Sequence, residues 1–154
     1  NSTMKTKQLF TSIIAAFVLF IGTASAADHS TISLAIGGYD LVSYHQNNGP
    51  SVGNGHHLAN HQGNIYAFVN ADNKAKFESN PGKYLPEFGG YCAYGASLGK
   101  KFYGDPLAST VVDGKLYLNL DSKVKSIWVK DRAENIVAAT KLWPSIKYVP
   151  AAEL

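Results

Sequence analysis

Cysteine is nearly absent from this chain of 154 residues, in which Cys92 stands alone. A single cysteine excludes an intramolecular disulfide, so the stability of the fold has to come from a hydrophobic core. Nine tyrosines and two tryptophans indicate that aromatic packing supplies much of that core. Phosphate-binding loops, dinucleotide-binding fingerprints and low-complexity segments are also missing from the sequence, and no internal repeat is evident in it.

A long hydrophobic run occurs only near the N-terminus, in residues 9–21. The run is shorter than the stretch of about 20 apolar residues that crosses a bilayer, which argues against a transmembrane helix. Lys5 and Lys7 precede it and the small residues 24–26 follow it, which is the pattern of a secretory signal peptide. We therefore predict that residues 1–26 are an N-terminal extension plus a cleaved signal peptide, and that the mature protein is periplasmic or secreted.

A strong net charge is missing from the predicted mature chain. The whole sequence has 14 basic and 11 acidic residues, and removing Lys5 and Lys7 leaves 12 against 11, a net charge of +1. So small an excess predicts no nucleic-acid partner, and no membrane partner after signal cleavage. Residues 27–154 have the length of a single domain, whose core we expect at about residues 34–145.

Short segments rich in β-branched and aromatic residues predict two hairpins. The first pairs strands 56–61 and 65–69 through a Gly63–Asn64 turn, and an isolated short strand is expected at 41–45. The second hairpin is expected over 110–118, because the Asp-Gly pair at its centre tolerates the positive φ angles of a two-residue turn.

Helices are predicted between and after the hairpins. Asn70 or Asp72 caps a helix that turns Ala75 and Phe77 toward the core, and the last helix is expected to stop at Pro144. Together these elements predict an α+β fold, with a small antiparallel sheet of hairpins and three to four packed helices.

The sequence resembles the exported YHS-domain proteins over nearly all of the predicted mature chain. The longest matching block is 77–94, FESNPGKYLPEFGGYCAY, and the shorter ones are 38–44, 66–68, 104–106, 111–119 and 143–144. The resemblance implies a YHS-like domain and, through shorter metal-linked modules that share the name, metal handling and not catalysis. Those modules usually have two or more cysteines, whereas this chain has Cys92 alone, and His45 occupies a position where an aromatic residue is expected.

Cys92 has three interpretations. It is a small, inert core side chain, or a thiolate that binds a soft metal such as copper, or a nucleophile paired with a histidine. A helix dipole would favour a thiolate at this position. A metal would need further ligands from His45, His57 or His61, or from Cys92 of a second molecule, because one thiolate alone does not bind tightly.

The histidines near the first hairpin do not form a ready metal cluster if their segment is a strand. His56 and His57 then point to opposite faces, and His57 and His61 share a face at a separation of about 13 Å, given roughly 3.3 Å per residue. Zinc or copper needs each imidazole nitrogen at about 2.0 Å. These side chains are therefore more readily interpreted as exposed strand histidines with no common ligand.

Three tyrosines, Tyr44, Tyr91 and Tyr94, are candidates for lining an aromatic pocket. No pair of carboxylates has a spacing typical of acid–base catalysis. The expected function is that of an exported, non-enzymatic YHS-domain protein that binds a soft transition metal, such as copper, through Cys92. The alternatives are a metal-free module for a small ligand or a protein partner, with Cys92 in the core, and a cysteine-dependent enzyme.

Overall fold

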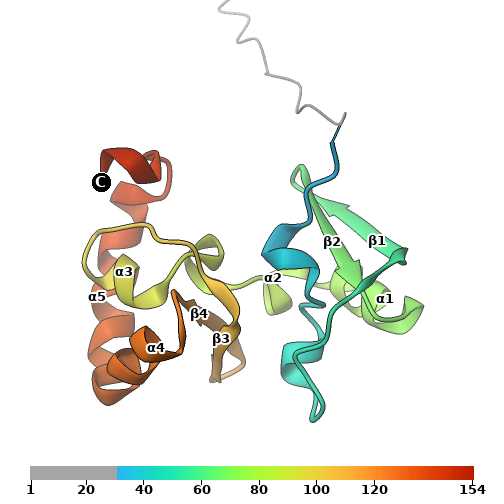
Figure 1. The fold of residues 1–154 in the computed structure, drawn as a ribbon, viewed down its shortest axis with the longest axis horizontal. Coiled ribbons are helices and arrows are strands. Elements are labelled where there is room, and N and C mark those ends of the chain that lie inside the picture. Colours follow the sequence, from blue (N-terminus) through green and yellow to red (C-terminus); the bar gives the residue numbers. More distant parts are fainter. Residues whose placement is uncertain (1–30) are drawn as a thin grey trace, which may run out of the picture.

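The computed structural model describes residues 31–154, so the predicted extension and signal peptide at 1–26 lie outside the described residues. Figure 1 shows two halves side by side, one containing α1, β1 and β2 and the other containing α3, α4, α5, β3 and β4. No helix within the described part of the chain is long and apolar enough to cross a bilayer. The elements in chain order are η1 (Ala35–Gly38), η2 (Ser43–His45), β1 (Asn54–His61), β2 (Asn64–Phe68), α1 (Ala71–Ser79), α2 (Pro81–Tyr84), η3 (Glu87–Gly90), α3 (Ala93–Ser97), β3 (Asp105–Val112), β4 (Lys115–Asn119), α4 (Ser122–Trp128), η4 (Val129–Asp131), α5 (Arg132–Ile146) and η5 (Ala151–Glu153).

The predicted α+β class is confirmed, with two antiparallel hairpins that form two separate two-stranded sheets. The Asp113–Gly114 turn is where the sequence placed it, with φ angles of 50° and 75°. The first hairpin turns one residue earlier than predicted, at Gln62 and Gly63, whose φ angles are 51° and 81°. Asn64 instead begins β2, where it pairs with His61.

The short strand predicted at 41–45 is wrong, because this segment is a turn followed by η2. The cause is the carboxylate of Asp40, whose Oδ1 accepts hydrogen bonds from the backbone N–H groups of Val42 (2.8 Å) and Ser43 (3.2 Å). Both bonds pull the chain back over the aspartate, and this local arrangement competes with an extended strand.

The helix predictions hold for the caps and fail for two details. The side chain of Asn70 caps α1 as expected, and Phe77 is buried, but Ala75 is exposed and Asn73 takes the inward position one turn before Phe77. Pro144 does not stop the last helix, because α5 continues through it to Ile146. A proline inside a helix removes the N–H that would bond four residues back, which leaves the Thr140 carbonyl without its usual donor.

The chain contains an internal structural repeat, contrary to the expectation from the sequence. Repeat A (residues 35–79) and repeat B (residues 87–128) each begin with three consecutive residues of positive φ that are followed by a tyrosine. Each continues into a hairpin whose first strand has an irregularity after its first pair, and then into a helix. The first strands, the helix caps and the buried helix aromatics correspond at a constant offset of 51 residues: 54 to 105, 70 to 121 and 77 to 128.

The two repeats share details that secondary structure alone does not require. The N–H of Asp40 donates to the Ser51 carbonyl at 2.9 Å, and the N–H of Cys92 donates to the Phe102 carbonyl at the same distance. Asp40 in repeat A therefore corresponds to Cys92 in repeat B. Both side chains are fully buried, at 0% and 1% exposure.

Strand β4 joins the two halves because it is buried on both faces. Leu116 and Leu118 pack in the core cluster of repeat A, with Phe68 and Phe77 among its members. Tyr117, which points the other way in the pleat, packs in the second cluster, against Trp128 at a ring separation of 5.5 Å. The core of each repeat is thus completed by the same strand.

Candidate functional site

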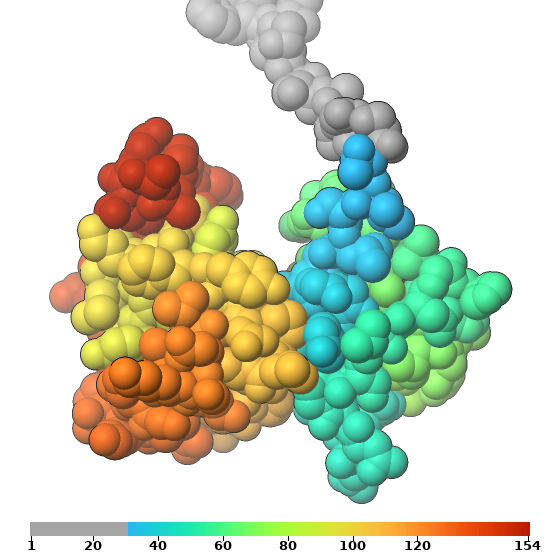
Figure 2. Space-filling model, in the orientation of Figure 1, coloured from blue at the N-terminus to red at the C-terminus, as the bar shows by residue number. Residues whose placement is uncertain are grey.

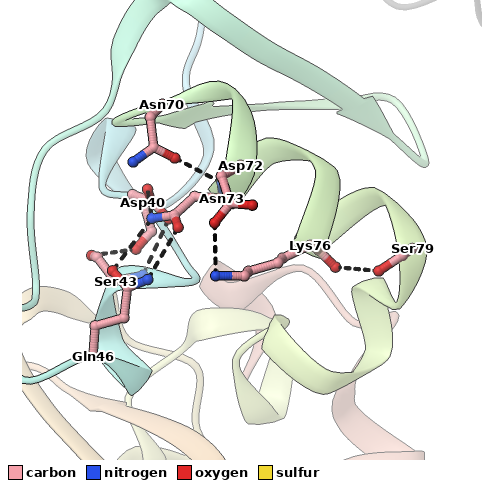
Figure 3. A network of polar contacts seen from close by, with 8 residues as sticks. All are labelled: Asp40, Ser43, Gln46, Asn70, Asp72, Asn73, Lys76 and Ser79. Carbon is pink, nitrogen blue, oxygen red and sulfur yellow. Dashed lines mark hydrogen bonds and ion pairs between the residues drawn. The ribbon is translucent and has the colours of Figure 1, made fainter.

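The polar network around Asp40 is the most extensive one in repeat A (Figure 3). Besides the two bonds to its Oδ1, the Oδ2 of Asp40 accepts from the Val69 N–H (2.9 Å) and from Nδ2 of Asn73 (2.7 Å). Asn73 is oriented in turn by Nε2 of Gln46, which donates to its Oδ1 at 3.1 Å. Every lone-pair direction of the buried carboxylate that faces protein is occupied, so Asp40 ties η2 to α1 and offers nothing to a ligand.

Cys92, the corresponding residue of repeat B, is equally enclosed. It is the N-cap of α3, and its Sγ accepts from the Gly95 N–H at 3.4 Å. Oδ1 of Asn119 lies 3.6 Å from the sulfur and also accepts from the Tyr94 N–H at 3.1 Å. The Tyr94 bond fixes the amide with its oxygen toward Cys92, and an oxygen beside sulfur requires the sulfur to be the donor. The geometry therefore holds Cys92 as a thiol.

The histidines named as partners for Cys92 lie elsewhere. His57 and His61 are in β1 as predicted, and His61 packs edge-on against Phe77 in repeat A, at 5.8 Å between ring centroids. His45 packs edge-on against Tyr84 at 5.4 Å. Among residues 31–154, no three His, Cys, Asp or Glu side chains gather in a group that could hold a metal ion.

Burial, and not a reactive partner, governs the titration of the side chains near these positions. Burial, and then the positive charge of Lys83, lowers the pKa of His45 below its ordinary value of 6.5. Burial, followed by the charges of Tyr39 and Asp105, raises the pKa of Tyr44 well above its usual range. The Tyr44 hydroxyl donates to the Pro106 carbonyl at 2.7 Å, which ties repeat A to β3.

A hollow of about 240 Å³ lies where the positive-φ turns of the two repeats meet. The turns are in direct contact, because a Cβ placed on Gly90 would lie 2.7 Å from Cδ1 of Ile36. Gly104 approaches even closer, since its Cβ would lie 2.1 Å from the Gly90 carbonyl oxygen. The lining residues are Ile36, Gly89, Gly90, Tyr91, Tyr103 and Gly104.

Two further hollows adjoin the first, and all three share Gly89. The larger, of about 490 Å³, lies against α5 and is lined by Gly82, Leu85, Pro86, Glu87, Phe88, Gly89, Thr140, Trp143 and Pro144. The smaller, of about 210 Å³, lies against the first hairpin and is lined by Ile36, Gln62, Asn64, Tyr66, Leu85, Pro86 and Gly89. We call the three together the Gly89 groove, and Figure 2 shows the surface notched between the two halves.

The aromatic wall of the Gly89 groove is held by a buried lysine. Nζ of Lys101 lies 4.7 Å from the centre of the Tyr91 ring and 6.0 Å from that of Trp143. The same ammonium donates to the carbonyls of Lys147 (3.1 Å) and Val149 (2.7 Å), just after the end of α5. A cation is favoured both by these carbonyls and by the ring faces, so Lys101 clamps Tyr91 and Trp143 together.

Of the three tyrosines predicted to line a pocket, only Tyr91 lines the Gly89 groove. Tyr94 packs against the second core cluster, and Tyr44 belongs to the first. Sequence reasoning missed Tyr103 and Trp143, the other aromatic walls of the groove. The available signal was the pair of Gly-Gly-Tyr triplets at residues 37–39 and 89–91, which mark the two turns that meet there.

Comparison with known proteins does not add a family. No family model, curated protein or solved structure matches this chain. The resemblance to exported YHS-domain proteins stays a prediction that rests on the quoted sequence blocks.

The donor set around Cys92 does not fit the copper ion that this resemblance implies. Copper(I) requires a thiolate and at least one further soft or imidazole ligand. Cys92 is 1% exposed, donates its proton to an amide oxygen and has no hydrogen bond to a histidine within residues 31–154. No step of the function is therefore derived through a metal.

Proposed function

We propose that the protein is an exported, non-enzymatic and metal-free binding module that holds a small, mainly apolar ligand in the Gly89 groove. The observation that carries the proposal is the convergence of three hollows on Gly89, with Tyr91, Tyr103 and Trp143 as walls. Small-ligand sites are typically concave, mostly apolar and placed where structural units meet. The export part of the proposal rests on the predicted signal peptide.

Non-enzymatic binding is supported by the enclosure of the residues best suited to chemistry. The Asp40 carboxylate has four donors, and the Cys92 thiol is closed off by Asn119 and Gly95. Neither lines the Gly89 groove. A nucleophile or general base has to reach a substrate, so these two groups support a structural role.

A titration with 2-phenylethanol, followed in ¹H–¹⁵N NMR spectra, tests the proposed site. We expect saturable shifts at the amides of Gly89, Gly90 and Gly104. A Gly89→Ala variant places a methyl group 3.6 to 3.8 Å from Trp143 and Tyr91, between the groove's rings, and should weaken binding at least about threefold.

The matched control is Gly114→Ala. Gly114 also has a positive φ, of 75°, but its Cβ meets nothing within 4 Å, so it imposes the same kind of backbone strain far from the groove. Binding in this variant should equal that of the parent. Shifts that do not saturate, or that persist unchanged in Gly89→Ala, would overturn the groove assignment.

The metal alternative is tested separately by titrating the reduced protein with Cu(I) against a competing chelator. The proposal expects equal, weak binding by the parent and by Cys92→Ser. Tight binding that Cys92→Ser loses would restore the metal function and refute a metal-free module.

A further inference from the structure

The part of the Gly89 groove that lies against α5 differs from the rest in its polar groups. Glu87 is the single ionisable side chain among its lining residues, and no lysine, arginine or histidine lines it. The closest cation to Glu87 is Lys115, whose Nζ lies 4.0 Å from Oε1, with both side chains partly exposed. An exposed pair at this distance is weak, so the carboxylate remains available to another cation.

A second acceptor in the same hollow comes from the proline inside α5. Pro144 lacks an N–H, and the carbonyl four residues earlier belongs to Thr140. Both residues line the hollow. The Thr140 hydroxyl donates its proton to the Ile136 carbonyl at 2.7 Å, so it does not satisfy the carbonyl of its own residue. A backbone acceptor without its helical donor therefore lies in the wall of the groove.

Aromatic and apolar side chains surround these acceptors. Phe88 and Trp143 meet edge to face at 5.8 Å, and Leu85 and Pro86 complete the apolar surface. An ionised carboxylate, a free carbonyl and an indole face are the groups that recognise an ammonium ion. The cation Lys101, on the other side of Trp143, is held by carbonyls after α5 and does not line the hollow.

We propose that this end of the groove binds the ammonium group of a small amine whose apolar body packs on Phe88 and Trp143. Glu87 and the Thr140 carbonyl accept the ammonium hydrogens, and Pro144 keeps the carbonyl free for that purpose. The inference rests on the proposed function, because it specifies the ligand class of the same groove.

The experiment compares 2-phenylethylamine, which is protonated at pH 7, with 2-phenylethanol, which has the same body and no charge. NMR titrations at low salt should give an affinity for the amine about fivefold higher or more. Glu87→Gln should remove this advantage and leave the alcohol's affinity unchanged. Glu134→Gln, an exposed acid in the first turn of α5 that does not line the groove, is the control and should preserve it.

Pro144→Ala supplies a second, independent readout. The new N–H can donate to the Thr140 carbonyl, so the amine should bind about two- to threefold more weakly while the alcohol binds as before. The variant should be at least as stable as the parent, because alanine favours a helix interior and proline does not.

The outcomes separate the two proposals. If neither probe binds in the groove, the proposed function fails and takes this inference with it. If both probes bind equally, or if Glu87→Gln keeps the preference for the amine, the amine site is refuted while the binding module stands.

Discussion

The buried carboxylate of Asp40 gives the sharpest test of how the fold is held together. Its Oδ1 accepts from the N–H groups of Val42 and Ser43, and its Oδ2 accepts from the Val69 N–H and from Nδ2 of Asn73, at distances between 2.7 and 3.2 Å. Asp40→Asn has nearly the same shape but replaces one oxygen by an NH₂ group. In either orientation of the new amide, that NH₂ faces two donors, so two hydrogen bonds are lost.

The magnitude follows from those two bonds. A hydrogen bond to a charged group contributes about 1.5 to 3 kcal/mol. Rotation of the Asn73 amide can restore one contact, but the Val69 N–H stays buried without an acceptor. We therefore expect Asp40→Asn to lower the free energy of unfolding by about 3 to 4 kcal/mol, a large part of the 5 to 15 kcal/mol of a typical domain.

Urea unfolding measures this loss directly, and Asp121→Asn is the matched control. Asp121 caps α4 through a bond to the Val124 N–H at 2.7 Å, it is exposed, and asparagine caps helices as well as aspartate does. The control should change the free energy of unfolding by no more than about 0.5 kcal/mol. A loss below about 1 kcal/mol for Asp40→Asn would show that the four bonds do not stabilise the fold as argued.

Three further predictions follow from burial and close packing. Cys92 should react with a thiol reagent at least about 100-fold more slowly in the native protein than in urea, and rapid native labelling would contradict its enclosure. Burial lowers the pKa of His45, so the unfolded chain binds its proton more tightly and stability is lost as pH falls below about 6.5; His45→Gln should remove this dependence in urea unfolding between pH 7.5 and 5, and an unchanged slope would refute it. Gly104→Ala forces a methyl group against the Gly90 carbonyl and should cost about 3 kcal/mol or more in thermal unfolding, against about 1 kcal/mol for Gly114→Ala; equal costs would mean that the close approach is unimportant.

The features that could be predicted from the sequence are those that depend on neighbouring residues. The turn at Asp113 and Gly114 is dictated by backbone angles that those two residues tolerate. The caps of α1 and α4 depend on one side-chain oxygen and an N–H three residues away. The strand expected at 41–45 failed because the acceptor that bends it, Asp40, was read as a turn residue whose influence ended at the turn.

The candidate site could not be predicted in the same way, because its walls come from distant parts of the chain. Ile36, Tyr103 and Trp143 meet around Gly89 only after the two repeats have packed together. The sequence indicated Tyr91 because it lies inside the block that resembles the YHS proteins. It pointed equally to Tyr94, which the start of α3 directs into the second core instead. Neither periodicity nor spacing distinguishes the two.

The internal repeat explains both why the groove lies at the centre and why the sequence concealed it. The residues common to the two repeats are those that the backbone demands, such as Gly53 and Gly104, or Gly63 and Gly114, whereas the side chains that fill each half have diverged. Asp40 became a cysteine at position 92 in the second copy, or the reverse, without opening either position to solvent.

The shared strand determines how the two halves depend on each other. Leu116 and Leu118 of β4 complete the core of repeat A, and Tyr117 of the same strand packs in repeat B, so removing either repeat exposes one face of β4. The halves should therefore unfold as one cooperative unit and not in sequence. A ligand at the seam contacts both repeats at once, and its binding free energy adds to the stability of the whole unit. The groove at Gly89 is thus a place where occupancy and global stability are linked by construction of the fold.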